Sequence, residues 1–197
     1  KAVPWGYDAD AEQEIYWGRF HSLTEPGRYR VVVPDIGESA PFVIANEAYH
    51  EVVTMATRAF YLQRSGIAIE DSDNSGVNHA AGHLEPAVLW DDRTTEVDVH
   101  GGWYDAGDYG RYLPTAAFAV NQLLYAYANA PEFFADDTLA IPESGNGVPD
   151  LLDEIRWELE WLLRMQREDG AVYHKITTHS YPAFSTLPGD DHAQLLL

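Results

Sequence analysis

Residues 100–112 read HGGWYDAGDYGRY, and this stretch concentrates more chemistry-bearing side chains than any other part of the chain. Two carboxylates, Asp105 and Asp108, stand three residues apart among four glycines and four aromatic residues. Glycines give the backbone conformations closed to other residues, and neighbouring carboxylates perturb each other's pKa values. Aromatic rings stack on the apolar faces of sugars. This combination of residues is therefore typical of an active-site loop in a carbohydrate hydrolase.

The same residues have a simpler interpretation, in which the stretch is only a helix-capping loop. Asp108 would then cap a helix that begins at Tyr109, and Asp105 would be solvated. Loops rich in Asp and Gly are common before helices, so the residue pattern alone leaves the two interpretations open.

Outward from this stretch, the apolar pattern predicts three helices. The first follows Asn46 and ends at Ser65-Gly66, and the second runs from about Tyr109 to Ala130 with Pro114 in its first turn. The third begins at Pro149 and ends before Asp169-Gly170. We explain Asp150, Asp153 and Glu154 as charges that favour the positive end of the third helix dipole, and Trp157 and Trp161 as helix-packing residues. Residues 67–99 have no sustained period, and we expect a long loop there.

The first part of the chain has a different pattern. Aromatic and β-branched runs at 14–17, 29–33 and 42–44 predict short strands separated by turns. Because strands come first and helices afterwards, we expect two segregated domains, residues 1–45 and residues 46–197.

The stretch at 100–112 resembles the GGW-x-DAGD-Y-G-[KR]-Y signature of glycoside hydrolase family 9, the inverting cellulases. Residues 59–66, 143–154 and 169–175 resemble further segments of that family, in the same order. Residues 26–29 and 39–44 resemble the end of the immunoglobulin-like domain that precedes the catalytic domain in one subgroup.

This resemblance implies a mainly α fold: part of an (α/α)6 helical barrel in residues 46–197, preceded by the C-terminal strands of a partial immunoglobulin-like β-sandwich in residues 1–45. It implies that Asp108 is the general base and that Asp105 helps to hold the attacking water. An inverting acid and base lie ~6.5–9.5 Å apart, so two carboxylates on one short loop do not form that pair. The acid of the family is a Glu that would lie beyond Leu197. We therefore expect an incomplete chain that needs the remainder of the catalytic domain and is inactive alone.

The implied activity is that of a secreted endoglucanase on cellulose or related β-glucan polysaccharides or oligosaccharides. We expect Trp103, Tyr104, Trp90 and His174 to bind substrate. Two alternatives stay open: an exo-acting glucosidase or glucosaminidase of the same family, and a non-catalytic glucan-binding domain. The second would not need both Asp105 and Asp108.

No cofactor is expected to be required, and no metal ligands are assigned. Some relatives bind a structural zinc after the first helix, but Ser65 and Gly82 occupy the places of its two cysteines, leaving His83 with His79 nearby. Zinc is therefore not expected, and the two histidines are interpreted as hydrogen-bonding loop residues. Residues 71–76 imitate the opening of a calcium loop, but its bidentate Glu is replaced by Gly82. A structural calcium stays open.

Composition limits the partners. The formal net charge of -20 repels phosphate backbones, which argues against a nucleic-acid partner. No window approaches the ~18 apolar residues of a membrane helix, so no membrane span is expected. Cysteine is absent, which excludes disulfides and thiolate metal ligands.

Overall fold

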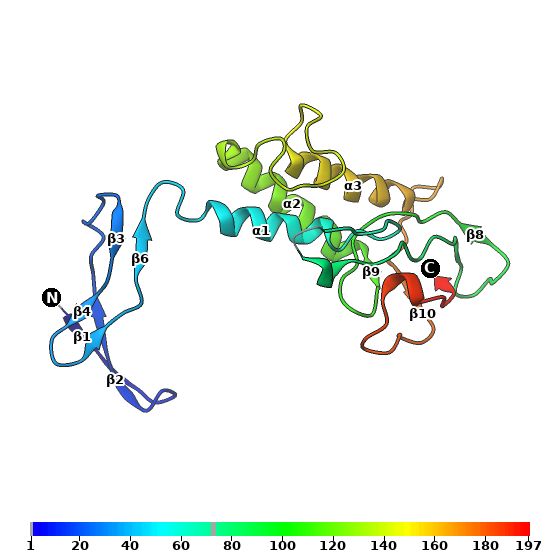
Figure 1. Cartoon of the computed structure of the whole chain (residues 1–197). Coiled ribbons are helices and arrows are strands. Elements are labelled where there is room, and N and C mark those ends of the chain that lie inside the picture. The colour runs from blue at the N-terminus through cyan, green and yellow to red at the C-terminus, as the bar shows by residue number, and fades with distance from the viewer. Residues whose placement is uncertain (1, 72–73) are drawn as a thin grey trace. The chain divides into compact units, whose positions relative to one another are not determined.

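The computed structural model describes residues 2–71 and 74–197 and divides into two compact units, Lys1–Glu51 and Val52–Leu197. Figure 1 shows the strands of the first unit and the helices and short strands of the second. The division falls within the first turn of a helix, a few residues after the predicted boundary. Each unit is considered by itself.

The first unit consists of three two-stranded antiparallel ladders. They pair β1 (Ala2–Asp8) with β2 (Gln13–Gly18), β3 (Gly27–Tyr29) with β6 (Phe42–Ile44), and β4 (Val32–Val33) with β5 (Gly37–Glu38). The predicted strands at 14–17 and 42–44 are confirmed. The run at 29–33 is split, because its first residue pairs with β6 whereas its last two pair with β5.

The described part of the second unit carries three α-helices. They are α1 (His50–Tyr61), which begins at the end of the first unit, α2 (Leu113–Asn129) and α3 (Asp150–Arg164). The third helix begins directly after Pro149, as predicted. The first begins later than expected, because residues 45–49 form turns before it, and the N–H groups of Ala48 and His50 donate to the carbonyls of Ala45 and Glu47.

The second helix also begins later than predicted, and the reason lies in its approach. Tyr109 has a φ of 56°, which lies in the left-handed region and cannot belong to a right-handed helix. Arg111 and Tyr112 form strand β9 and pair with Ile176 and Lys175. The helix therefore starts at Leu113, with Pro114 in its first turn as expected.

Short strands far apart in sequence form a five-stranded sheet in the order β8-β7-β11-β10-β9. Its strands are β7 (Ala87–Val88), β8 (Glu96–Val97), β9 (Arg111–Tyr112), β10 (Lys175–Thr178) and β11 (Leu195–Leu196). Three 3-10 turns complete the elements: η1 (Ser75–Val77), η2 (Pro131–Phe133) and η3 (Pro188–Asp190). The described residues of the expected loop at 67–99 thus hold one 3-10 turn and two strands of two residues each.

The core of the second unit surrounds α3. One apolar cluster lies between α2 and α3, where Val120 packs with Leu151 and Ile155. A second cluster places Trp161 and Met165 against the sheet residue Ile176. Trp161 is only 1% exposed, which confirms its predicted packing role. Among the described residues, no helix is both long enough and apolar enough to cross a membrane.

Candidate active site

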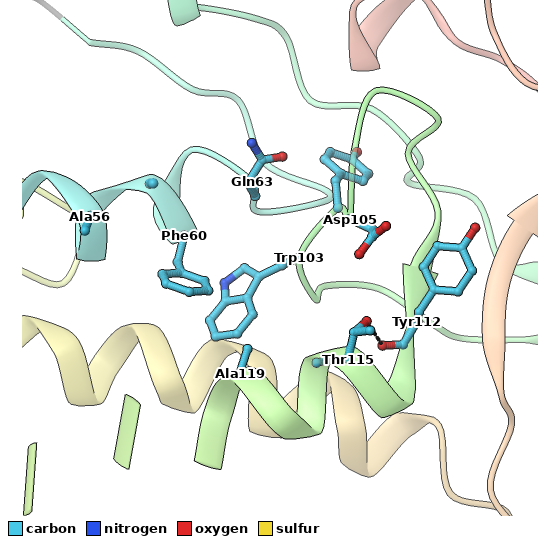
Figure 2. Close-up of a pocket in the computed structure, with 11 residues that line it drawn as sticks. Ala56, Phe60, Gln63, Trp103, Asp105, Tyr112, Thr115 and Ala119 are labelled. Carbon is cyan, nitrogen blue, oxygen red and sulfur yellow. Dashed lines mark hydrogen bonds between the residues drawn. The ribbon is translucent and has the colours of Figure 1, made fainter. Parts of the chain in front are cut away.

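A pocket of about 380 Å³ opens in the second unit between the end of α1, the loop at 103–105 and the start of α2. Figure 2 shows aromatic side chains and one carboxylate converging on it. Its lining residues are Ala56, Ala59, Phe60, Gln63, Trp103, Tyr104, Asp105, Tyr112, Thr115, Ala116 and Ala119.

The shape of the pocket follows from residue size. The helices present alanines, whose small side chains leave the space open, whereas Phe60 and Trp103 close one side. The rings of Phe60 and Trp103 are tilted against each other with centroids 4.7 Å apart. Trp103 is only 7% exposed, and its indole N–H donates to Glu154 at 2.7 Å. Its N–H is therefore engaged by the protein, and only its exposed edge can meet a ligand.

The backbone of the loop is anchored to the end of α1. Ser65 N–H donates to the Gly102 carbonyl, and Tyr104 N–H donates to the Gln63 carbonyl, both at 2.8 Å. Gly102 has a φ of 80°, and a Cβ at this position would lie 2.6 Å from the Trp161 ring. Only glycine fits there without displacing a buried indole. The close approach of Gly102 to the Trp161 ring thus determines where the loop backbone lies against the core.

A buried ion pair supports the same wall. The guanidinium of Arg64 donates through Nε to both Glu154 oxygens at 3.1 Å and through Nη1 to Glu143 at 3.0 Å. Burial lowers the pKa of Arg64, but the carboxylates of Glu154 and Glu143 outweigh burial and raise it above its usual value. Glu154 thus links Arg64 to the indole of Trp103, which locks the ring that faces the pocket.

The two loop carboxylates have different surroundings. The Asp105 side chain is exposed, and in Figure 2 it lies between Trp103 and Tyr112. Within residues 2–71 and 74–197, no hydrogen bond is made to its carboxylate, while its N–H closes the loop on Gly110 at 2.8 Å. Its oxygens are therefore available to a ligand or to water.

Asp108 is half-buried and is held from two sides. It accepts hydrogen bonds from Gly110 N–H and from the Tyr112 hydroxyl, both at 3.3 Å. Burial, together with the nearby charge of Asp108, raises the pKa of Tyr112 to about 12. The phenol therefore stays protonated over the whole neutral range and keeps donating to Asp108.

The helix-capping interpretation of this loop is wrong. The N-cap of α2 is Tyr112, and no side-chain cap bond is made there. Asp108 instead bonds to Gly110 and Tyr112 within a loop that faces the pocket.

Comparison with known proteins decides the family. The model for glycosyl hydrolase family 9 matches residues 49–193. The chain belongs to glycosyl hydrolase family 9. The Cellodextrinase of Butyrivibrio fibrisolvens is 36% identical over 200 residues, which cover 100% of this chain and 36% of that protein.

Two solved structures are similar to this chain over nearly its whole length. A metagenome-derived family 9 endoglucanase superposes with a TM-score of 0.84 and 44% identity, covering 98% of this chain and 36% of that one. AaCel9A in complex with cellobiose-like isofagomine gives a TM-score of 0.81 and 33% identity, covering 100% of this chain and 39% of that one. The chain thus spans little more than a third of the length of each of these three relatives. Its helices are consistent with a fragment of an (α/α)6 barrel.

Two of the predicted substrate-binding residues are not among those that line the pocket. Trp90 is 55% exposed and lies against His179, with ring centroids 6.0 Å apart. His174 is exposed, and its carbonyl accepts from Leu113 N–H at 3.0 Å. Trp103, Tyr104 and Asp105 do line the pocket, whereas Asp108 lies behind the lining residue Tyr112.

Eight lining residues were not predicted as site residues: four alanines, and the larger side chains of Phe60, Gln63, Tyr112 and Thr115. Phe60 and Gln63 belong to a segment that already resembled family 9, and Tyr112 closes the signature of that family. Their position in these motifs was a usable signal. Thr115 follows in the first turn of α2 and carries no comparable signal.

The residues discussed as metal ligands make other contacts. His79 contacts the Ala80 carbonyl, while His83 contacts Tyr104 and Asp191. The described residues contain no group of three or more His, Cys, Asp or Glu arranged to hold a metal ion. The calcium-like stretch at 71–76 lies partly outside the described residues.

Proposed function

We propose that the whole protein to which this chain belongs hydrolyses β-1,4-glucosidic bonds in cellulose or related β-glucans, as an endoglucanase. The observation that carries the proposal is the loop at 103–112, which places Asp105 in an aromatic-walled pocket of about 380 Å³ with Asp108 directly behind Tyr112. Family membership and the names of the relatives, Cellodextrinase and endoglucanase, support the same substrate class.

The mechanism is a single displacement with inversion at the anomeric carbon. Asp108 is the general base, which takes a proton from the attacking water. Asp105 accepts the other hydrogen of that water and so fixes the direction of attack. The general acid is a Glu outside this chain, on the opposite side of the scissile bond.

The environments of the two carboxylates support these roles. The Tyr112 hydroxyl and Gly110 N–H donate to the Asp108 carboxylate and hold it in one orientation. Asp105 keeps its oxygens free among the described residues, as a group that binds water must. Both stand on a loop whose start is fixed by backbone bonds to Gln63 and Ser65, just after α1, which limits the motion of the water.

The proposal includes the domain organisation. Residues 1–45 form the C-terminal part of an immunoglobulin-like sandwich, and residues 46–197 form the N-terminal part of an (α/α)6 barrel. The exposed aromatic pair Trp5 and Trp17 supports a sandwich whose other strands are contributed from elsewhere, since none of residues 2–51 is buried. The enzyme is secreted and requires no cofactor.

The test is proton NMR of cellotetraose cleavage by the whole protein, beside its Asp108→Asn variant. We expect the α-anomer as the first product signal and no turnover by the variant. A β-anomer as first product would overturn inversion, and an active variant would overturn the role of Asp108. An untouched tetraose would overturn the glucanase assignment and favour amino-sugar oligomers or a glucan-binding role.

A second candidate is exo-action on short oligosaccharides, favoured by the similarity to the Cellodextrinase of Butyrivibrio fibrisolvens. Viscosity of a soluble cellulose derivative separates the two. An endoglucanase lowers viscosity early, when few reducing ends have formed, whereas an exo-acting enzyme releases sugars while viscosity hardly changes.

A further inference from the structure

A buried histidine lies directly behind the loop that carries Asp105 and Asp108. The His83 side chain is 1% exposed and bridges two parts of the chain. Its Nδ1 lies 2.7 Å from the Tyr104 hydroxyl, and its Nε2 lies 3.2 Å from the carboxylate of Asp191. Tyr104 immediately precedes Asp105, so the chain Asp191–His83–Tyr104 ends one residue from a proposed catalytic group.

The position of His83 is set by close backbone packing. A Cβ on Gly82 would lie 2.0 Å from the Pro188 carbonyl oxygen, so residue 82 must be glycine for the two segments to meet. His83 itself has a φ of 56°, which lies in the left-handed region that few residues other than glycine adopt. Such an uncommon backbone conformation persists where the surrounding structure determines it.

The other end of the loop is fixed to the same C-terminal segment. Tyr109 donates its hydroxyl to the Thr186 carbonyl at 2.5 Å. The Tyr104 and Tyr109 rings lie 4.9 Å apart, and each lies 5.3 Å from the His83 ring. Residues 105–108 therefore stand between two tyrosines, of which Tyr109 bonds to residues 186–191 directly and Tyr104 is linked to them through His83.

The two hydrogen bonds of His83 fit one tautomer of the neutral imidazole. Burial lowers the pKa of His83 below its ordinary value, which favours the neutral ring. A neutral ring that donates Nε2–H to Asp191 presents Nδ1 as an acceptor to the Tyr104 hydroxyl. The phenol then has one fixed direction.

We propose that His83 is a positioning residue, which holds Tyr104 through its hydroxyl and thereby fixes the backbone from which Asp105 reaches the attacking water. This inference rests on the proposed function, and it deepens that function by assigning the support of the loop to three side chains outside the reacting groups.

The decisive variant is His83→Phe in the whole protein, which keeps a ring of similar size and removes both hydrogen bonds. We expect kcat on cellotetraose to fall about 10- to 100-fold while KM changes less than about threefold, because a misplaced water slows the reaction more than it weakens binding. His83→Gln can donate to one partner and accept from the other, so we expect it to recover most of kcat.

A double variant tests whether His83 and Tyr104 act through one bond. Tyr104→Phe removes only the hydroxyl, and we expect the Tyr104→Phe, His83→Phe double variant to be no slower than the slower single variant. His79→Phe is the matched control, because within the described residues the His79 ring makes its one hydrogen bond to the neighbouring Ala80 carbonyl. It should leave kcat within about twofold of the wild type.

The outcomes separate the inference from the proposed function. A wild-type protein that does not cleave the tetraose overturns the proposed function. An active wild type whose His83→Phe variant keeps its kcat overturns the positioning role alone. The positioning role is also overturned if His83→Phe has a lower kcat, a higher KM and a lower thermal unfolding midpoint, and His83→Gln does not restore them. That pattern marks a purely structural residue.

Discussion

Two sets of carboxylates in the second unit differ in how much of their hydrogen-bonding capacity the protein uses. Asp150, at the start of α3, is 0% exposed and accepts from the N–H groups of residues 137, 138 and 139 and from the Ser144 hydroxyl. Asp108 accepts two bonds at 3.3 Å, and the exposed Asp105 accepts none from the described residues. A carboxylate saturated by the protein holds the fold, whereas one with free lone pairs can act on water.

The same comparison changes the explanation of the three acidic residues at the start of α3, which were expected to serve the helix dipole. Asp150, Asp153 and Glu154 do lie near the start of the helix, where negative charge is favourable. All three are buried, however, and they bind a loop, Asn146 and Arg64, respectively. The helix dipole is thus a minor contribution beside the hydrogen bonds that these residues accept.

The largest expected effect is that of Asp108→Asn in the whole protein. We expect hydrolysis to fall ~10²–10⁴-fold, because a general base is removed, while oligosaccharide affinity stays close to wild type. Calorimetric titration with cellotetraose beside a rate assay checks both. An unchanged rate, or a variant that no longer folds, would contradict the distinction between carboxylates that hold the fold and carboxylates that act on water.

Asp150→Ala should give the opposite result, a loss of stability rather than of chemistry. It leaves three backbone N–H groups and one hydroxyl without their acceptor, which costs roughly 2–4 kcal/mol. Urea unfolding measures the change, with Asp91→Ala on an exposed loop position as control. Wild-type stability in Asp150→Ala would show that this saturated carboxylate is dispensable.

Glu158 is a third kind of carboxyl group, and the pH dependence of stability tests its protonation state. Burial raises the pKa of Glu158 from 4.5 to about 8. Between these values the unfolded chain has released a proton that the folded chain keeps, so this group lowers stability as pH rises from 5 to 8. Between pH 5 and pH 8, the free energy of unfolding of Glu158→Gln should therefore fall by ~1–3 kcal/mol less than that of the wild type.

Thermal unfolding midpoints at pH 5 and pH 8 test this prediction. Glu160→Gln is the matched control, because Glu160 is exposed on the same helix. An equal decline in wild type and in Glu158→Gln would contradict a buried carboxyl that stays protonated.

The smallest effect is expected for Arg156→Ala. Arg156 pairs with Asp153 at 2.9 Å, but its side chain is 56% exposed, so solvent screens the pair. We expect a change of ~0–1 kcal/mol in the free energy of unfolding. A loss of several kcal/mol would mean that the buried Asp153 depends on this surface partner.

Local signals in the sequence were sufficient for α3 and for the loop at 103–112. Pro149 and the apolar stripe after it specify a helix without help from distant residues. The start of α2 could not be predicted in this way, because Arg111 and Tyr112 are drawn into a strand by Lys175 and Ile176, more than sixty positions away. Strands of two residues carry no period of their own.

The pocket was predictable only in part for the same reason. Trp103, Tyr104 and Asp105 come from the motif itself, but Phe60 and Gln63 join them through backbone bonds between residues 63–65 and 102–104. The buried pair of Arg64 and Glu154 joins residues ninety positions apart. Trp90 and His174 do not line this pocket, and their predicted contact with substrate stays a prediction. No local pattern shows where a long loop turns.

The sheet order β8-β7-β11-β10-β9 also has a consequence for how the protein is made. Leu196 in β11 leaves the ribosome 84 residues after Tyr112 in β9, counting 196 minus 112. At ~5–20 residues per second, this interval lasts roughly 4–17 s. During that time the nascent chain carries Asp105 and Asp108 without the strands that frame their loop. Such distant pairings fold slowly, so the site is among the last parts of the unit to form.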